Sequence, residues 1–231
     1  MARALRVLSS LALKGVLEKL RPDFERALGA LELRFDATQA ILPLVRRGEP
    51  ADLLILTTEA MDELQAGGVV ARAWLLGSSG VGVAVRAGAP KPDIGSVDAL
   101  RAALLSAQSV AHSKVGASGI YFAGLLERLG IAARLKKRVV VEKGPVGLAV
   151  AAGEAELGVQ QLCELAPVPG IEIAGPLPEP VQRLTSFSAG IPADAADAEG
   201  ARALVGLLHS DAMREVMLEG GLQPASSAPC A

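Results

Sequence analysis

The feature that most constrains the fold is a regular alternation of short apolar runs with longer segments of helical periodicity. Residues 5–8 form the first run, and apolar side chains then recur at helical spacing between Leu13 and Phe24. Residues 53–56 are continuously apolar, which is typical of a central strand in a parallel sheet. Repeated strand–helix units predict an α/β protein in which a mostly parallel sheet is flanked by helices.

The same reasoning predicts the remaining elements along the chain. Strands are expected at residues 5–8, 31–35, 53–56, 80–86, 109–111, 139–141, 157–161, 171–174 and 184–191. Helices are expected at 13–24, 40–45, from Thr57 or Thr58 to 64, 96–105, after the turn at 112–121 to about 129, from Pro145, at 196–208 and at 210–218. The Pro/Gly-rich segment 87–95 is expected to be a loop, and residues 224–231 a flexible tail.

Composition excludes several classes of function. The 231 residues are 51% hydrophobic and carry a formal net charge of −2, with neither a basic stripe nor basic–aromatic interleaving. We therefore expect no nucleic-acid partner and no binding to acidic membranes. No apolar run is long enough for a membrane span, so no membrane insertion is expected.

The first fourteen residues resemble a secretory leader only loosely. Arg6 and Lys14 bracket a short apolar stretch, and no small-x-small cleavage site follows. The sequence as given therefore predicts a cytoplasmic protein. A periplasmic location is expected instead if a removed leader preceded Met1.

The cysteines and histidines give little sign of a metal or redox centre. Cys163 and Cys230 lie far apart, so a disulfide between them is allowed but not required. His112 and His209 have no neighbours with metal-ligand spacing. We expect neither a metal nor a cofactor.

A second pattern points to anion binding. Residues 112–121 read as a strand end, a loop of small residues and a helix start, and similar junctions occur at 8–10 and 35–38. A helix start exposes unpaired N–H groups and the positive end of the helix dipole, which together favour an anion. Three such junctions predict a site for a small charged ligand.

The order of these junctions resembles the molybdate-binding group of type 2 periplasmic substrate-binding proteins, the capture components of ABC importers. The segments that carry the resemblance are residues 8–14, 48–56, 82–85, 118–121 and 153–158. It extends to about Pro224 and implies two α/β lobes, each with a mostly parallel sheet flanked by helices. Lobe 1 would comprise residues 1–79 and 188–231, and lobe 2 residues 80–187. The ligand would lie in the cleft between them, and an ABC importer permease would be the partner if the protein is exported.

The resemblance also implies which residues bind the ligand. These are Ser9 and Ser10 at the first junction, Asp36, Thr38 and Gln39 at the second, and Ala117, Ser118 and Gly119 at the third, with Gln160 or Gln161 where family members place a tyrosine. Independently of the resemblance, the charge of Lys14 near the first junction makes it a candidate counter-ion for a ligand carboxylate. Ala12 stands where the family usually has a serine. A carboxylate near the site repels an oxometallate dianion, whereas glutamines and a lysine suit an organic carboxylate.

Each of these residues also has a purely structural interpretation. Ser9 and Ser10 can cap the first helix, Lys14 can pair with Glu18 at i+4, and Asp36 can be a strand-end carboxylate. His112 can be a packed histidine or a group that moves a proton.

Three functions remain open at this stage. The first is binding of a small anion without chemistry, because no nucleophile–base pair is recognisable. The second is an isomerase of a small unsaturated or keto acid on the same scaffold, with His112 or another site residue transferring a proton. The third is a ligand-sensing domain, which would need a further DNA-binding or partner segment.

Overall fold

The computed structural model describes residues 3–226, which fold as two compact units. Unit 1 comprises Met1–Ser78 and Thr185–Ala231, and unit 2 comprises Ser79–Leu184. The chain passes from one unit to the other within strand β4 (Val70–Arg86) and at the start of strand β9 (Leu184–Pro192). Unit 1 is therefore built from two segments that are distant in sequence.

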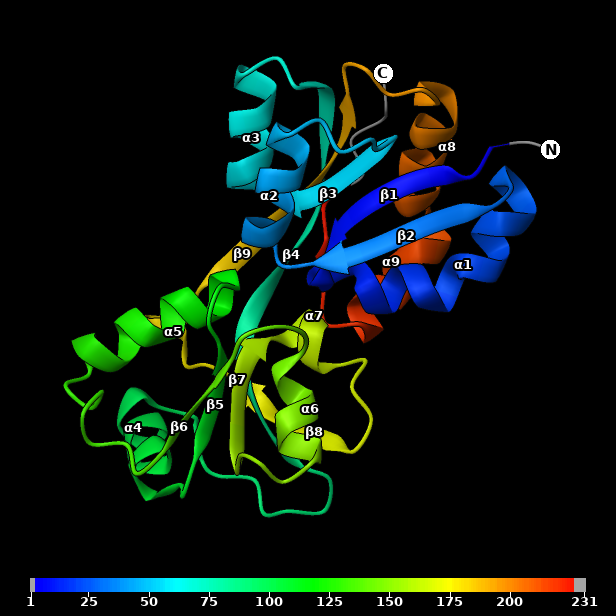
Figure 1. The fold of residues 1–231 in the computed structure, drawn as a ribbon. Coiled ribbons are helices and arrows are strands. Elements are labelled where there is room, and N and C mark those ends of the chain that lie inside the picture. Colours follow the sequence, from blue (N-terminus) through cyan, green and yellow to red (C-terminus); the bar gives the residue numbers. More distant parts are fainter. Residues whose placement is uncertain (1–2, 227–231) are drawn as a thin grey trace. The chain divides into compact units, whose positions relative to one another are not determined.

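Unit 1 is a mixed sheet with helices on both faces (Figure 1). Its strands follow the order β2-β1-β3-β9-β4, and β10 pairs with β4. Strands β1, β2 and β3 are parallel, while β9 runs antiparallel to β3. The elements not yet defined are β1 (Leu5–Ser10), the 3₁₀ turn η1 (Leu11–Leu13), α1 (Lys14–Leu28), β2 (Leu31–Asp36), α2 (Thr38–Arg46), β3 (Leu53–Thr57), α3 (Thr58–Ala66), α8 (Ala198–Leu208), α9 (Asp211–Glu219) and β10 (Gln223–Pro224).

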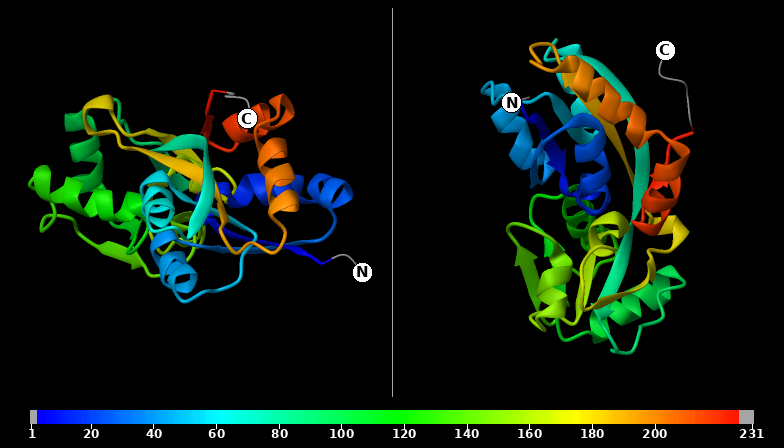
Figure 2. Two further views of the ribbon diagram at one scale, coloured as in Figure 1. Left: turned by 90° about the horizontal axis from the view of Figure 1, so that it is seen from above. Right: turned by 90° about the vertical axis from the view of Figure 1, so that its right-hand side faces the viewer.

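Alternate side chains of the central strands supply the core of unit 1 on its two faces. Leu54 and Leu56 of β3 pack with α2 and α3, together with Met61. Right-handed connections from β1 to β2 and from β2 to β3 place α1 and α2 on opposite faces of the sheet. Helix α1 contacts α8, and α8 and α9 lie with α1 on the face opposite α2 and α3 (Figure 1, Figure 2).

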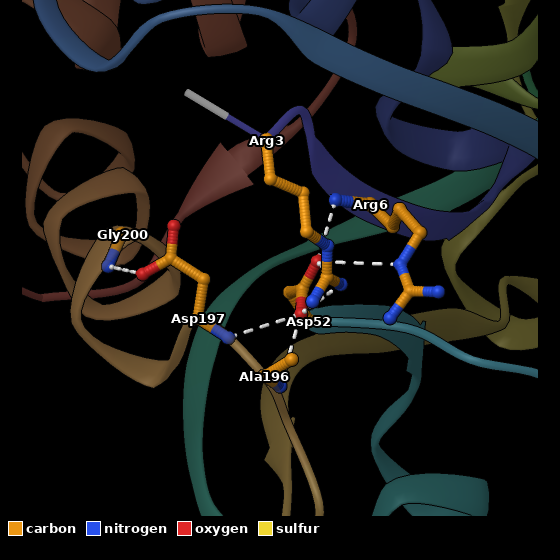
Figure 3. Close-up of polar contacts among 6 residues, drawn as sticks. All are labelled: Arg3, Arg6, Asp52, Ala196, Asp197 and Gly200. Carbon is orange, nitrogen blue, oxygen red and sulfur yellow. Dashed lines mark hydrogen bonds and ion pairs between the residues drawn. The ribbon is translucent and has the colours of Figure 1, made fainter. Parts of the chain in front are cut away.

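The buried carboxylate of Asp52 holds together three segments of unit 1 (Figure 3). Its oxygens accept two hydrogen bonds from Nη2 of Arg3, each 3.0 Å long, and one of 2.9 Å from the backbone N–H of Arg6. The Arg6 guanidinium adds an ion pair at 3.5 Å. The backbone N–H groups of Ala196 and Asp197 donate to the same carboxylate at 3.2 Å. The start of β1, the entry to β3 and the loop before α8 thus converge on one side chain.

These donors keep Asp52 ionised. Burial by itself would raise the pKa of Asp52, but the N–H groups of Arg6 and Asp197 and the charges of Arg3 and Arg6 outweigh it and lower the pKa. This stabilisation is present above the usual carboxyl pKa of about 4 and is lost as the pH falls through the lower folded-state value.

Unit 2 has the same kind of architecture. The second half of β4 pairs with β7 on one side and β8 on the other, and β7 continues to β5 and β6 in parallel. Its other elements are α4 (Val97–Ser106), β5 (Val110–Ser113), α5 (Ala117–Arg128), β6 (Arg138–Val141), α6 (Val146–Ala151), β7 (Leu157–Gln161), α7 (Leu162–Leu165), β8 (Ile171–Pro176) and the 3₁₀ turn η2 (Glu179–Val181). Helices α4 and α5 pack on one face, around Phe122 and Leu100, and α6 packs on the other against Ala111 (Figure 1).

The α/β class predicted from the sequence is confirmed, and most predicted elements are present within a few residues of their expected bounds. The largest error concerns β4, which begins ten residues earlier than the predicted strand at 80–86. Its first half contains the apolar residues 73–76, but Arg72 precedes them and small residues follow from Gly77. Arg72 and Leu75 are exposed, and the Arg72 guanidinium stacks on the half-buried Trp74 at 5.2 Å, so burial in this half does not alternate along the strand. The short elements α7, β10, η1 and η2 were not predicted.

The structure bears on several predictions made from single residues, beginning with the helix caps. Ser96 caps α4 as expected, because its side chain accepts a hydrogen bond of 3.1 Å from the Ala99 N–H. Thr57 stands at the N-cap of α3 without a side-chain capping bond. Cys163 is a buried free thiol, and Cys230 lies outside the described residues, as does most of the predicted tail. Within residues 3–226, no helix has the length and hydropathy to cross a bilayer.

Replacing Asp52→Asn is expected to lower the free energy of unfolding at pH 7 by about 3 kcal/mol, because the substitution leaves two guanidinium groups without their buried anion. Denaturant unfolding measures this loss. The matched control is Asp23→Asn, since Asp23 is exposed on α1 and forms an exposed ion pair with Arg26 at 2.9 Å. The control is expected to change stability by less than about 0.5 kcal/mol. Equal effects of the two substitutions would contradict the role assigned to Asp52.

Candidate functional site

The candidate residues of unit 1 lie at one edge of its sheet. Because β1, β2 and β3 are parallel, their carboxyl ends meet there, and ligands of open α/β sheets bind at such edges. The register pairs Ser10 with Asp36 and Ser9 with Phe35. Ser9, Ser10, Asp36 and Thr38 are therefore brought together, as the sequence predicted for adjacent junctions.

The two serines at the end of β1 differ in their hydrogen bonds. Ser9 Oγ is fully buried and donates to the carbonyl oxygen of Ser10 at 2.9 Å. Ser10 occupies the N-cap of η1, yet its side chain makes no capping bond. Its buried Oγ has no hydrogen-bond partner among residues 3–226. Helix capping therefore does not account for either hydroxyl.

The β2–α2 junction is tied to the next junction. Thr38 is buried, and its Oγ1 accepts a hydrogen bond of 3.3 Å from the Thr57 N–H at the end of β3. Asp36 Oδ1 accepts from the Ala37 N–H at 2.9 Å, as expected of a strand-end carboxylate. Gln39 is exposed on the first turn of α2.

Lys14 lies at the first position of α1, directly after η1. Its Nζ lies 3.7 Å from the Glu18 carboxylate, and both side chains are partly exposed. This i,i+4 pair is the structural alternative considered for Lys14. A partly exposed pair of this length contributes little to stability, so the ammonium group stays available to an anion.

Unit 2 repeats the arrangement at the carboxyl ends of β5, β6 and β7. The turn after β5 is closed by Ser113, whose Oγ accepts from the Gly116 N–H at 2.9 Å. Helix α5 begins at Ala117, and the N–H groups of its first turn have no partners within the helix. Ser118, in that same turn, is buried, and its Oγ has no hydrogen-bond partner among the described residues.

Gly119 has a packing role that the sequence did not reveal. A Cβ atom at this position would overlap the carbonyl oxygen of Ser113, so the start of α5 can lie this close to β5 only without a side chain. Gly119 was predicted to bind ligand. The structure gives it a reason to be glycine that involves no ligand.

His112 is a buried histidine with both ring nitrogens engaged. Arg138 Nη2 lies 3.0 Å from His112 Nε2, and a guanidinium can only donate, so Nε2 accepts. The proton is then on Nδ1, which donates to the Ser113 carbonyl oxygen at 3.0 Å. Burial lowers the pKa of His112, the Ser113 carbonyl raises it and the Arg138 charge lowers it further, with a net decrease. The ring also meets Phe122 edge-on at 5.7 Å, so the contacts are those of a neutral structural residue.

The end of β7 carries a polar network. Gln160 is buried, and its Oε1 accepts from the Val146 N–H at 2.7 Å while its Nε2 donates to the carboxylate of Glu164. Burial raises the pKa of Glu164 to about 7, against the lowering effect of the Gln160 bond. Gln161 is also buried. Glu164 was not among the predicted residues, although its place three residues after the strand end could have suggested it.

Two other polar side chains near the β5–α5 junction form contacts within unit 2. Lys114 forms an exposed ion pair with Glu142 at 3.0 Å, and the Tyr121 hydroxyl donates to the Val181 carbonyl at 2.8 Å. Within residues 3–226, no group of three His, Cys, Asp or Glu residues is placed to hold a metal ion. In the part of the chain that the structure describes, the carboxyl-end edge of each sheet thus has a buried hydroxyl without a hydrogen-bond partner. The edge in unit 2 also carries Glu164, whose pKa is raised to about 7.

Comparison with known proteins adds a family and several relatives. The family model described as bacterial extracellular solute-binding protein matches residues 5–223. An aconitate isomerase from a Pseudomonas species is 39% identical over 236 residues, covering 97% of this chain and 89% of the relative. The periplasmic molybdate-binding protein of Azotobacter vinelandii superposes with a TM-score of 0.79 at 18% identity, covering 96% of this chain and 100% of that chain.

The sulfate-binding protein SubI from Mycobacterium tuberculosis H37Rv superposes with a TM-score of 0.70 at 15% identity, covering 97% of this chain and 88% of that chain. At such low identities the solved structures are informative about fold alone. They confirm the predicted two-lobed periplasmic-binding-protein fold class and the resemblance to molybdate-binding proteins.

The packing role of Gly119 predicts opposite effects of two substitutions in one helix. Gly119→Ala is expected to destabilise the protein by about 2 kcal/mol or more, because the backbone of β5 or α5 has to move. In the same helix, a Cβ atom at Gly124 would lie 3.4 Å from Nη1 at the end of the flexible Arg128 side chain. Gly124→Ala is therefore expected to stabilise the protein by up to about 1 kcal/mol. Thermal unfolding of both variants tests this. A neutral Gly119→Ala would refute the packing role.

Proposed function

This chain belongs to the bacterial extracellular solute-binding protein family, and we propose that it binds a small organic polycarboxylate anion. The observation that carries the proposal is the pair of buried hydroxyls, Ser10 Oγ and Ser118 Oγ, without partners among residues 3–226. A buried polar group without a hydrogen bond costs about 1–3 kcal/mol. A carboxylate oxygen that accepts from the hydroxyl removes this cost in the bound state.

The surroundings of the hydroxyls favour carboxylates over oxometallate dianions. Asp36 is the register partner of Ser10, so it places a negative charge beside that junction. A compact dianion such as molybdate concentrates its charge near this carboxylate, whereas an organic polyacid distributes charge along a carbon skeleton. Lys14 supplies a nearby cation. The relative at 39% identity carries the name of an enzyme that acts on an unsaturated tricarboxylate, which supports this ligand class.

A second candidate function is isomerisation of such an acid by proton transfer. Two observations favour it: the identity to an aconitate isomerase across nearly the whole chain, and a titratable carboxyl group at the strand edge of unit 2. A group with a pKa near the working pH can both take up and return a proton. Anion binding is common to both candidates, since an isomerase must also hold its substrate.

The two candidates imply different partners and locations. A transport role requires an ABC importer permease and a location outside the cytoplasmic membrane. An isomerase requires neither. Fractionation of cells that express the complete gene product separates these cases.

Ser10→Ala and Ser118→Ala are each expected to weaken binding of trans-aconitate by about 1.5–3 kcal/mol, or roughly 10- to 150-fold in Kd. Neither substitution breaks a hydrogen bond within the described residues, so the stability of the unliganded protein is expected to stay unchanged or to rise slightly. Isothermal titration calorimetry measures binding, with cis-aconitate, citrate, sulfate and molybdate as comparison ligands. Thermal unfolding measures stability.

Ser106→Ala is the matched control for binding. Its hydroxyl lies at the end of α4 and donates to the Ala103 carbonyl at 2.9 Å, so its removal is expected to leave Kd unchanged. Binding of none of the acids by the wild-type protein would refute the proposed function. Preference for molybdate over every carboxylate would refute the ligand class.

A further inference from the structure

We infer that Glu164 is a catalytic residue that moves a proton on the bound acid, with Gln160 as its positioning residue. The inference rests on the second candidate function, isomerisation. It differs from the sequence prediction, which named His112 for this role.

The topology of unit 2 places Glu164 where a ligand would be reached. Strands β5 and β7 are adjacent and parallel, with His112 opposite Val159 in the register. The β5–α5 and β7–α7 junctions therefore lie at the same edge of the sheet, where the carboxyl ends of the two strands are about 5 Å apart. The first junction holds the unsatisfied Ser118 hydroxyl, and the second holds Glu164. An anion held by Ser118 would thus lie at the same edge as the short helix α7 that carries Glu164.

The hydrogen bonds of Gln160 hold the Glu164 carboxyl group in one orientation. The amide oxygen of Gln160 is taken by the Val146 N–H, so only its NH₂ group can face Glu164. A carboxylate has about four acceptor sites, and this bond uses one of them. Glu164 is only half-buried, so the rest of the group is available to a ligand. A fixed orientation of this kind is what a proton-transfer group requires.

Among the described residues, no opposite charge contributes to the pKa of Glu164, which depends on burial and on the bond from Gln160. Strand β4 meets α7 at the uncharged residues Ser79 and Gly82. Strand β7 and helix α6 contain no ionisable side chain. Strand β8 contributes Glu172, which pairs with Lys91 at 3.1 Å and accepts from the Gly88 N–H. Cys163 of α7 itself is buried, and burial raises the pKa of its thiol. Burial likewise raises the pKa of Glu164 to about 7, so near neutrality both of its protonation states are populated.

His112 is less suited to the same task. Both of its ring nitrogens are engaged within unit 2, by Ser113 and Arg138. To accept a proton it would have to break the bond from Arg138 and become a cation next to a guanidinium. Glu164 needs no such rearrangement.

The reaction assigned to Glu164 conserves atoms and electrons. The carboxylate removes a proton from the methylene carbon of an unsaturated polycarboxylate, and the C–H electron pair forms a double bond to the central carbon. The former double-bond pair then takes the proton back from the Glu164 carboxylic acid at the far carbon. In aconitate this moves the double bond across the central carbon and interconverts the cis and trans isomers. No oxidant, reductant or second substrate is consumed.

The test is turnover and binding of trans-aconitate by the full chain carrying Glu164→Gln. Turnover, followed by proton NMR of the cis and trans isomers, is expected to fall by about 10²- to 10⁴-fold, while Kd from calorimetry stays within about threefold. In the wild type, kcat/KM is expected to rise with pH through about 7, because the carboxylate form accepts the proton. The residual kcat/KM of Glu164→Gln is expected not to rise with pH in this range.

Two further variants keep the test decisive. Glu164→Asp retains the carboxyl group. Its turnover is expected to lie between those of the wild type and Glu164→Gln, and its kcat/KM is expected to rise with pH as in the wild type. This variant gives a result even if Glu164→Gln unfolds. The matched control is Glu154→Gln, an exposed residue of the same unit, which is expected to match the wild type. His112→Gln is expected to lower the free energy of unfolding and to leave the pH dependence of kcat/KM unchanged.

The outcomes distinguish this inference from the proposed function. Turnover by Glu164→Gln within tenfold of the wild type overturns the role of Glu164. A wild-type protein that binds trans-aconitate but does not isomerise it also overturns this role, and leaves the binding function standing. A wild-type protein that binds no carboxylate refutes the proposed function itself.

Discussion

The carboxylate of Asp52 is the interaction on which unit 1 depends. Unit 1 is assembled from two segments separated by the whole of unit 2, and Asp52 bonds to both: to Arg3 and Arg6 at the N-terminal strand, and to the backbone before α8. A buried ion usually costs more to desolvate than its pairing returns. Here the carboxylate satisfies backbone donors as well as cations, so it also fixes the relative positions of three chain segments. Those segments align β1 and β3, whose ends carry Ser10 and Thr57.

The two units use the same physical device at their sheet edges. In each, parallel strands end side by side, and the following turns place a small hydroxyl residue where its oxygen is buried and unsatisfied. Retaining an unsatisfied hydroxyl is unfavourable for an empty protein, because replacement by alanine removes the cost. The proposed function gives these hydroxyls a partner in the bound ligand. In that proposal the apolar faces of the sheet supply stability and its polar edge binds the ligand.

Sequence patterns predicted the repeated strands and helices because burial imposes a period on the apolar residues. They missed the first half of β4, since Arg72 interrupts its apolar residues and burial does not alternate along this half of the strand. The sequence placed Ser10, Thr38 and Ser118 at the ends of strands or the starts of helices, and they lie there in the structure. Their role as ligand-binding residues stays a prediction. The packing role of Gly119 could not be predicted, since the proximity of the Ser113 carbonyl is a property of tertiary packing. The role of His112 depends on Arg138, a partner 26 residues away that no local pattern reveals.

Under the inferred role of Glu164, the contrast between His112 and Glu164 is what would separate a binding protein from an isomerase on this fold. Both scaffolds need hydroxyls and amides to hold carboxylates, and such donors stabilise charge without taking part in bond making. Proton transfer adds one requirement, a group whose protonated and deprotonated forms have similar free energies. Burial moves a histidine away from that condition at neutral pH and moves a carboxyl group toward it. Burial raises the pKa of Glu164 to about 7, so this carboxyl group meets the requirement. If Glu164 has the role inferred above, isomerase activity on an anion-binding fold depends on the environment of one carboxyl group.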